Sequence, residues 1–429
     1  MLDIAFIRTE CDQVKNAARA KGVDVDIDRL LDLDERRRKL ITENSELRAR
    51  RNDLSRAVRE LRGGDRDQAI AESKSVGARV TEVERELAEV AAAFDELMLR
   101  VPSIPAPEVP PGESDADNLE IRRWSQPRQL DFPVRDHVDL AQALDLVDFS
   151  RPQAYAGSRS YALKGDGVLL EQAVLNFALN HVAAKGFVPV SPPVLVKEQA
   201  LVGTGFFPLG YEDTYRLERD GLFLAGTSEV GLVSLHRDEI LDEKRLPIRY
   251  VGISPCFRRE AGAAGKDTKG LYRVHAFNKV EQVVLCRNDE AVSEQEHHGL
   301  LRNAEEIVQA LGLPHRVALA CAKETGLGQV RKHELETWMP SRNGYCETHS
   351  CSTLHEFQAR RSKIRYRDQS GSLRFVHTLN NTAIASPRIL IAILENYQNA
   401  DGSVTIPGVL RPYLGGRSRL EPRGESGSR

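Results

Sequence analysis

Five leucines recur at intervals of seven residues, and this spacing constrains the fold more than any other feature of the sequence. They are Leu33, Leu40, Leu47, Leu54 and Leu61. After the break RGGDR, a second apolar series continues in steps of four and three, at Val76, Val80, Val83, Leu87, Val90, Phe94 and Leu97. Each series places one apolar stripe along a helix, and such a stripe needs a second helix to cover it. Two stripes joined through Gly63-Gly64 predict an antiparallel helical hairpin with about 35 residues in each helix.

Charge is divided unevenly between the two predicted helices, because the first is rich in arginine and the second in glutamate. Ion pairs between and along the helices are one explanation of these charges. The other is a track of arginines that contacts a phosphate backbone, with Arg37, Arg48, Arg51 and Arg59 as the candidates. The net charge of the chain is −3, so any nucleic-acid binding rests on a local basic surface. A hairpin with little else to bury should project as an arm.

The sequence changes character after the second series. Residues 101–118, VPSIPAPEVPPGESDADN, are proline-rich and then acidic, which predicts a linker between an N-terminal domain (1–100) and a second domain (119–414). The polar residues 415–429 predict a disordered tail. No run of about 18 apolar residues is present, and the start MLDIAFIRTECDQVK lacks a basic-then-apolar signal. We therefore expect no membrane span and a cytoplasmic location.

Six cysteines are scattered through the sequence without a CxxC pair, as expected for reduced thiols. Cys346, His349, Cys351 and His355 lie close together in sequence, but their spacing fits none of the usual structural zinc patterns.

The stretch from Ser254 to Glu281 has the pattern of a second hairpin. Its two ends alternate as strands do, and AGAAGKDTKG between them predicts a mobile, basic tip. Alternation puts charged and aromatic side chains on one face: Cys256, Arg258 and Glu260, with Arg273, His275, Phe277, Lys279 and Glu281. This face is either a solvated surface with cross-strand ion pairs or a platform for a nucleotide, and spacing alone does not decide between them.

Resemblance to a known family favours the nucleotide. PCFRREAGAAGKDTKGLYRVHAFNKVE resembles motif 2 of the class II aminoacyl-tRNA synthetases, and that of the seryl-tRNA synthetases in particular. KGFVPVSPPVLV resembles motif 1, with Pro193 at its proline, and HTLNNTAIASPRILIAILENYQ resembles motif 3. In the latter, Ser386 is expected to be the N-cap of an apolar helix, with Pro387 first in the helix and Arg388 in its first turn.

The resemblance implies an α+β architecture: an N-terminal antiparallel coiled-coil arm, then a class II catalytic domain built on an antiparallel sheet with flanking helices. It implies a homodimer formed through motif 1. The implied enzyme is an ATP-dependent ligase that makes seryl-adenylate from L-serine and ATP and transfers the seryl group to the 3′ end of tRNA(Ser), gripped by the arm. Whether tRNA(Sec) is a second acceptor is left open. ATP and Mg²⁺ are the implied cofactors.

The resemblance also implies roles for individual residues. Arg258, Arg388 and Glu281 are the expected catalytic residues. Serine would be bound by Thr227, Ser228, Glu229, Arg258, Glu281, Asn380 and Thr382. ATP would be bound by Arg258, Arg259, Glu260, Arg273, Val274, Phe277, Glu347, Thr348, His349, Ser350 and Arg388. Glu347 and Ser350 would hold Mg²⁺, which favours oxygen ligands of this kind.

Several positions depart from the usual family pattern: Gly226, Ser228, Ala276, His333, Glu334 and Thr353. They motivate the hypothesis of a specialised second copy, tolerant of an antibiotic that mimics seryl-adenylate or supplying seryl-tRNA to a biosynthetic pathway. Two other classes are weighed against the ligase. A carrier-protein aminoacyl ligase would lack the helical hairpin, and a non-catalytic tRNA-binding relative would lose the motif arginines or the metal pair.

Overall fold

The structure is a computed structural model that describes residues 1–261 and 269–422. It divides into a smaller unit, Leu2–Pro102, and a larger unit from Ser103 onward. Part of the expected linker belongs to the larger unit, where the amide of Ser103 donates to the carbonyl of Leu327 and that of Ala106 to Val330.

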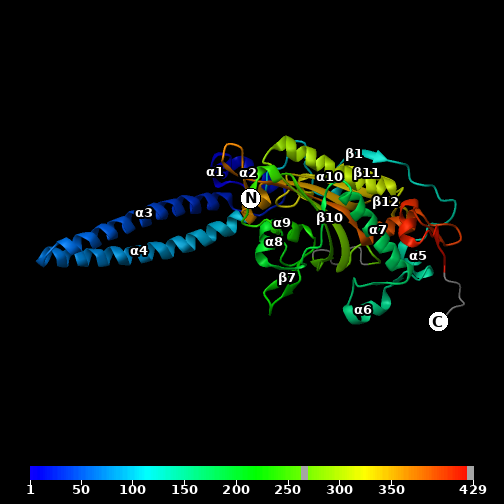
Figure 1. Cartoon of the computed structure of the whole chain (residues 1–429), viewed down its shortest axis with the longest axis horizontal. Helices are drawn as coiled ribbons and strands as arrows, with labels where there is room; N and C mark the ends of the chain where they lie inside the picture. Colours follow the sequence, from blue (N-terminus) through cyan, green and yellow to red (C-terminus); the bar gives the residue numbers. More distant parts are fainter. Residues whose placement is uncertain (262–268, 423–429) are drawn as a thin grey trace. The chain divides into compact units, whose positions relative to one another are not determined.

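The smaller unit is helical throughout. Its elements are α1 (Ile4–Thr9), α2 (Cys11–Ala20), α3 (Ile27–Glu60) and α4 (Gly63–Met98). Figure 1 shows α3 and α4 running side by side in opposite directions. The predicted hairpin is therefore confirmed, with helices of 34 and 36 residues. Asp26 begins α3 by accepting from the amide of Arg29 at 2.8 Å, an N-cap bond that satisfies one of the free amides of the first turn.

The turn of this hairpin lies just before Gly63-Gly64, where the sequence predicted it. Leu61 and Arg62 connect the helices, and Gly63 is already the first residue of α4, with φ +59°, which glycine adopts without strain. The seam is tightest away from this turn, because Leu33 and Leu40 are buried whereas Leu61 is 36% exposed.

Ion pairs between the two helices account for several of the arginines. The pairs are Arg36 with Glu86, Arg48 with Glu84, Arg50 with Glu72, and Arg79 with Glu43. Arg37 lies 3.6 Å from Asp34 and over the ring of Phe94. For Arg51 and Arg59, no ion pair is found within the described part of the chain. Two of the four candidate phosphate contacts are thus engaged inside the hairpin, and two are available.

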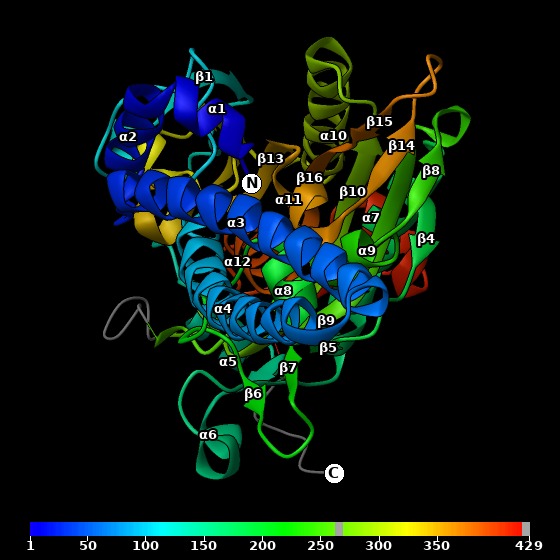
Figure 2. The same cartoon turned by 90° about the vertical axis from the view of Figure 1, so that its left-hand side faces the viewer.

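The larger unit is built on an eight-stranded sheet, seen in Figure 2. In spatial order its strands are β1 (Leu119–Trp124), β11 (His315–Leu319), β12 (Arg331–Met339), β13 (Gly344–His355), β16 (His377–Ala385), β10 (Ala276–Cys286), β9 (Ile248–Phe257) and β4 (Val188–Val190). All neighbours are antiparallel except β4 and β9. The expected α+β class is confirmed.

Helices cover both faces of this sheet. The main core lies where α7 (Asp166–Ala183), α10 (Glu290–Ala310) and α12 (Ser386–Asn396) pack on one face, with Val280 and Val284 among its buried side chains. A smaller core on the other face holds Val283 and Leu285 under α9 (Glu229–Ser234) and α11 (Phe357–Ser362). Successive residues of β10 thus point to opposite faces, as alternation predicts. The expected hairpin of β9 and β10 is present, and most of its tip, 262–268, lies outside the described residues.

Shorter elements complete this unit. They are α5 (His137–Ala143), α6 (Ser150–Ala156), α8 (Glu198–Thr204), β2 (Val147–Asp148), β3 (Ala162–Leu163), β5 (Leu195–Lys197), β6 (Arg216–Leu217), β7 (Leu222–Leu224), β8 (Ile240–Asp242), β14 (Arg365–Arg367), β15 (Leu373–Phe375), β17 (Val404–Thr405) and β18 (Arg419–Leu420). No described helix is both long and apolar enough to cross a membrane.

Two local expectations are wrong. Residue 386 does not cap α12: Ala385 occupies that position, Ser386 is already helical, and the start is set by the end of β16 rather than by a side-chain cap. The predicted disorder from residue 415 also fails up to residue 422, because β18 pairs with β17 and buries Leu420. Burial of that one leucine outweighs the polar composition around it.

Candidate active site

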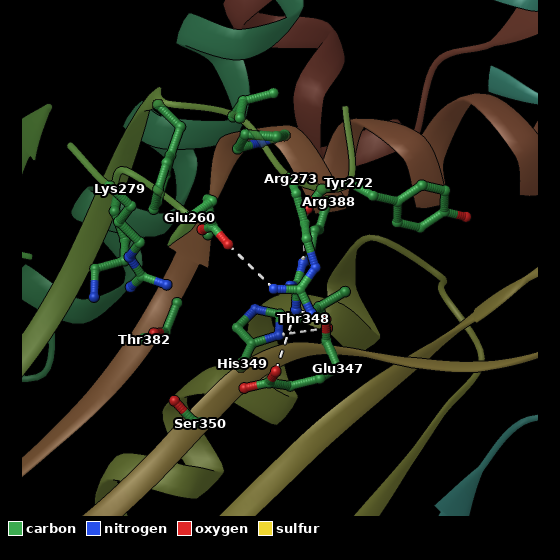
Figure 3. Close-up of a pocket in the computed structure, with 15 residues that line it drawn as sticks. Glu260, Tyr272, Arg273, Lys279, Glu347, Thr348, His349, Ser350, Thr382 and Arg388 are labelled. Atoms are coloured by element: carbon green, nitrogen blue, oxygen red, sulfur yellow. Dashed lines mark hydrogen bonds and ion pairs between the residues drawn. The ribbon is translucent and has the colours of Figure 1, made fainter. Parts of the chain in front are cut away.

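Residues of the β9–β10 hairpin, of β13 and of the start of α12 line a cavity (Figure 3). It is lined by Arg258, Glu260, Tyr272, Arg273, Val274, Phe277, Lys279, Glu347, Thr348, His349, Ser350, Thr382, Ala385, Pro387 and Arg388. The structure therefore brings together every expected ATP-binding residue except Arg259, from three segments far apart in the sequence. A second cavity adjoins it and shares Arg258, Arg273 and Arg388.

Arg258 is the most open charge in the cavity. Its backbone amide donates to the carbonyl of His275 at 2.9 Å, which fixes the chain where β9 ends. Its guanidinium lies 5.3 Å from the centre of the Phe277 ring, and its Nε donates to the carbonyl of Gly226 at 3.4 Å. No carboxylate among the described residues forms an ion pair with it. A guanidinium held over a ring with its fork free is suited to bind an anion such as a phosphate or carboxylate.

Two further arginines of the cavity are tied to carboxylates. Arg273 contacts Glu260 at 3.1 Å. Arg388, in the first turn of α12, donates to the backbone carbonyl of Glu347 at 2.8 Å and contacts its carboxylate at 3.2 Å (Figure 3). Burial alone would raise the pKa of Glu347, but Arg388 and Lys332 outweigh it and hold that pKa below its ordinary value. The carboxylate of Glu347 is therefore ionised at neutral pH.

A buried polar network adjoins the cavity on β10, β16 and α9. The side-chain amide of Asn380 donates to Glu229 at 3.2 Å and to Glu281 at 3.1 Å. Thr382 donates to the other oxygen of Glu281 at 3.4 Å, and Lys279 forms an ion pair with the same carboxylate. All of these residues except Lys279 were expected from the sequence to bind serine. Two carboxylates joined by one amide suit a small substrate that carries an ammonium and a hydroxyl group.

The amide of Glu229 donates to the hydroxyl of Thr227 at 3.3 Å, which sets the first turn of α9. Burial, and then the charge of Glu281, raise the pKa of Glu229 to about 7. Ser228, next to it, is buried, and its hydroxyl has no hydrogen-bond partner within the described residues.

Among the residues that the sequence did not assign to the site, Lys279 and Gln358 contact its carboxylates directly. Lys279 lines the cavity with its side chain 7% exposed, and its alternation with Phe277 and Glu281 was the signal that could have assigned it. Gln358 is buried on α11 and donates to Glu229 at 2.7 Å, while accepting from Thr378 at 2.7 Å. Nothing in the sequence around Gln358 indicates this contact, which depends on how α11 packs on β16.

Arg259 is the exception among the expected ATP-binding residues. It lines neither cavity, and its guanidinium is half-exposed, 4.0 Å from Glu212. Its backbone amide donates to the carbonyl of Asp213. Its assignment to ATP stays a prediction.

The unusual residues do not form one group. His333 and Thr353 lie on the far side of the sheet from the cavity, where both contact His297 of α10, at 2.8 and 2.9 Å. Glu334 lies opposite Ser350 in the β-ladder, and Gly226 supports Arg258 through its carbonyl. The departures at His333 and Thr353 therefore lie in the packing behind the sheet and line neither cavity.

His333 makes the fold sensitive to acid. Burial lowers its pKa to about 4, from an ordinary value near 6.5 in the unfolded chain. The unfolded state then binds more protons between these values, so stability is full above pH 6.5 and falls as the pH drops. We expect a loss on the order of 2 kcal/mol by pH 5 from this residue. His333→Tyr should lose less stability than the wild type between pH 7.5 and 5 in urea unfolding. The exposed His298→Gln is the control, and equal losses in all three proteins would refute the prediction.

Comparison with known proteins identifies the class of protein to which this fold and site belong. A family model described as tRNA synthetase class II core domain (G, H, P, S and T) matches residues 215–397, which hold the β9–β10 hairpin and α12. The larger unit is thus the catalytic core of a class II aminoacyl-tRNA synthetase. A second model, seryl-tRNA synthetase N-terminal domain, matches residues 1–105. The chain belongs to the seryl-tRNA synthetase family.

Full-length relatives agree with this assignment. The serine–tRNA ligase of Symbiobacterium thermophilum is 46% identical over 96% of this chain and 98% of the relative, and that of Deinococcus radiodurans is 46% identical over 98% and 99%. The crystal structure of seryl-tRNA synthetase from Pyrococcus horikoshii complexed with ATP has a TM-score of 0.91 at 38% identity, covering 99% of this chain and 100% of that one. The cytoplasmic enzyme of Naegleria fowleri in complex with AMP has a TM-score of 0.86 at 29% identity, with 99% of both chains covered.

These findings confirm the family, the fold class and the ligase activity expected from the sequence. They do not favour the specialised second copy, the carrier-protein ligase or the non-catalytic relative.

Proposed function

We propose that the chain activates L-serine with ATP and transfers the seryl group to tRNA(Ser). The observation that carries this proposal is the guanidinium of Arg258, which lies over the Phe277 ring and lines the same cavity as Lys279 and Thr382, two residues that contact the buried carboxylate of Glu281. A serine carboxylate that attacks the α-phosphorus of ATP puts both negative groups at that guanidinium. Arg258 would hold them together and stabilise the charge that develops on the phosphate.

The remaining cavity residues would position ATP. Phe277 would stack on one face of adenine, Glu260 would accept from its amino edge, and Arg388 would bind the distal phosphates. Little covalent chemistry is then required of the protein, because orientation and charge stabilisation supply the rate enhancement.

Mg²⁺ would be held by Glu347 and Ser350. The fit is supported by the donor set: an ionised carboxylate and a hydroxyl three residues apart on strand β13, both lining the cavity. These hard oxygen ligands suit Mg²⁺, which commonly completes its shell with phosphate oxygens and water. When bound, the ion would offset negative charge on the phosphates of ATP.

The test of the proposal is ATP–pyrophosphate exchange with each of the twenty amino acids, without tRNA. Exchange that depends on serine alone is expected, followed by aminoacylation of tRNA(Ser) transcripts. Parallel assays with tRNA(Sec) decide whether it is a second acceptor. Absence of exchange with every amino acid would overturn the proposal.

Glu229 should make serine binding depend on pH. Its carboxylate must be ionised to attract the ammonium group of serine, and its pKa is raised to about 7. Lowering the pH below 7 therefore protonates it, and the KM for serine in pyrophosphate exchange should rise about tenfold for each unit. The KM for ATP serves as the internal control and should change little. A KM for serine that is flat from pH 8 to 6 would contradict this role.

The arm is proposed to contact the backbone of tRNA(Ser) through Arg51 and Arg59, whose charges are not engaged in ion pairs within the described residues. Replacing both by alanine should lower kcat/KM for aminoacylation about tenfold and reduce the salt slope by about 2. Exchange without tRNA should be unchanged. Arg85→Ala, on α4 and paired with Glu89, is the control. A loss of exchange activity in the double variant would point to misfolding, and unchanged aminoacylation would refute the contact.

A homodimer is proposed through motif 1, in a cytoplasmic enzyme. Support comes from Val188 on the edge strand β4 and Leu195 on β5, two apolar side chains of this segment that are 55% and 46% exposed and that a partner subunit could cover. Sedimentation of the wild type and of Val188→Glu tests the assembly: a dimer that the substitution weakens is expected.

A further inference from the structure

A buried histidine and glutamate lie behind the cavity, where they join three segments of the larger unit. His137, at the start of α5, is 3% exposed, and Glu395, two turns along α12 from Arg388, is fully buried. The backbone amide of His137 donates to Glu395 at 3.1 Å, and its Nδ1 lies 3.3 Å from the same oxygen. Neither residue belongs to the three motifs' expected ligand sets.

The other ring nitrogen of His137, Nε2, accepts a hydrogen bond from the segment that leads to the cavity-lining residues Tyr272 and Arg273. The backbone amide of Leu271 donates to Nε2 at 3.1 Å. Because Nε2 accepts here, the proton of the neutral ring must sit on Nδ1, where Glu395 accepts it. The next residue, Tyr272, packs its ring edge-on against His137, with centroids 5.1 Å apart, and lines the cavity.

Space around this contact is closed. Gly270 has φ +70°, and a Cβ atom there would lie 2.0 Å from Nε2 of His137. The neighbouring Lys269 pairs at 2.8 Å with Asp136, whose carboxylate also accepts from the amides of Val138 and Asp139 and so caps α5. The return segment 269–272 is thus fastened to the start of α5 at two successive points.

We propose that His137 and Glu395 act as a positioning pair for ATP. Glu395 orients the imidazole, the imidazole holds the amide of Leu271, and Arg273 and Val274, which follow directly, are thereby set in register with Arg388 on α12. Neither residue touches substrate. The pair fixes the distance between the two segments that carry the nucleotide-binding arginines.

Substitution of His137 by asparagine or glutamine tests the roles of the two ring nitrogens separately. In His137→Asn, the side-chain amide reaches the place of Nδ1 and keeps the bond to Glu395 but loses the acceptor for Leu271. In His137→Gln, the amide reaches the place of Nε2 and restores that acceptor. Ser341→Ala is the matched control, because it removes another hydrogen bond to Glu395, of 2.9 Å, without touching His137.

The inference rests on the proposed function, so serine-dependent exchange by the wild type is established first; its absence would refute that function rather than the pair. KM for ATP and KM for serine are then measured in pyrophosphate exchange, with thermal melting as the check on folding. His137→Asn is expected to raise KM for ATP about tenfold, with KM for serine within twofold of wild type. His137→Gln should recover most of this change, and Ser341→Ala should show none.

A second variant guards against loss of folding in the first. Gly270→Ala leaves His137 and Glu395 unsubstituted, but its new methyl group would displace the imidazole from Leu271. It should therefore also raise KM for ATP selectively. The proposal is overturned if KM for ATP is unchanged in His137→Asn and Gly270→Ala, if both Michaelis constants rise together, or if His137→Gln is as impaired as His137→Asn.

Discussion

Arg258→Ala should lower kcat/KM for serine-dependent pyrophosphate exchange by at least about 10³-fold. A single preorganised donor to a developing oxyanion is commonly worth 10²–10³ in rate, and Arg258 presents a full charge with two parallel N–H groups. Its guanidinium is free of ion pairs within the described residues, so no competing carboxylate must be displaced when the substrates bind. Arg258→Lys keeps the charge but not the fork, and should recover only a small part of the loss.

Arg287→Ala provides the control, since this arginine is 45% exposed and pairs with Glu243 at 3.6 Å, outside both cavities described above. Its exchange activity should equal that of the wild type. If Arg258→Ala folds normally and lowers kcat/KM less than tenfold, Arg258 does not take part in the activation of serine.

Alanine should be activated about 10⁴-fold less efficiently than serine, measured as the ratio of kcat/KM values in exchange. The two substrates differ by one hydroxyl group, and a pocket of apolar atoms could not separate them so far. Glu229, Glu281 and Asn380 are buried or half-buried and already share hydrogen bonds. With alanine bound, the polar groups of these residues that would pair with the serine hydroxyl are shut off from water and have no hydrogen-bond partner. Leaving buried polar groups unpaired costs binding free energy.

Thr382→Val tests this explanation. It keeps the shape of the side chain and removes a hydroxyl that donates to Glu281. Activity with serine should fall by about 10- to 100-fold, while activity with alanine changes little, so the ratio narrows. A ratio of kcat/KM for serine to that for alanine below 10² in the wild type would show that the network does not recognise the serine hydroxyl.

Much of the architecture could be predicted from sequence because its signals are local and periodic. Two apolar stripes, heptad leucines on α3 and a mostly valine series on α4, predict both helices and their antiparallel packing, since each stripe can be covered by the nearest matching one. Alternation along β10 correctly separates Phe277 and Lys279, which line the cavity, from Val280 and Val284, which lie in the main core. The motif residues Arg258, Glu347 and Arg388 do meet in one cavity.

Where local signals were weak, prediction failed. Polar composition after residue 415 indicated disorder, yet one buried leucine and a two-residue pairing hold that segment in place. Ser386 had the chemistry of an N-cap, but the sheet decides where β16 ends and α12 begins. Helix boundaries depend on the last strand contact as much as on the side chain at the junction.

The sequence by itself determined the class of fold, the family and most of the side chains that line the cavity, because these follow from periodicity along single elements and from motifs read in order. Only the tertiary structure decided which charges remain free and which buried partners support them. Arg48 is engaged by Glu84 whereas Arg51 is not, and Gln358 and His137 reach Glu229 and Leu271 across 129 and 134 positions of sequence. Such contacts depend on how separate helices pack against one sheet, and no local pattern records that packing.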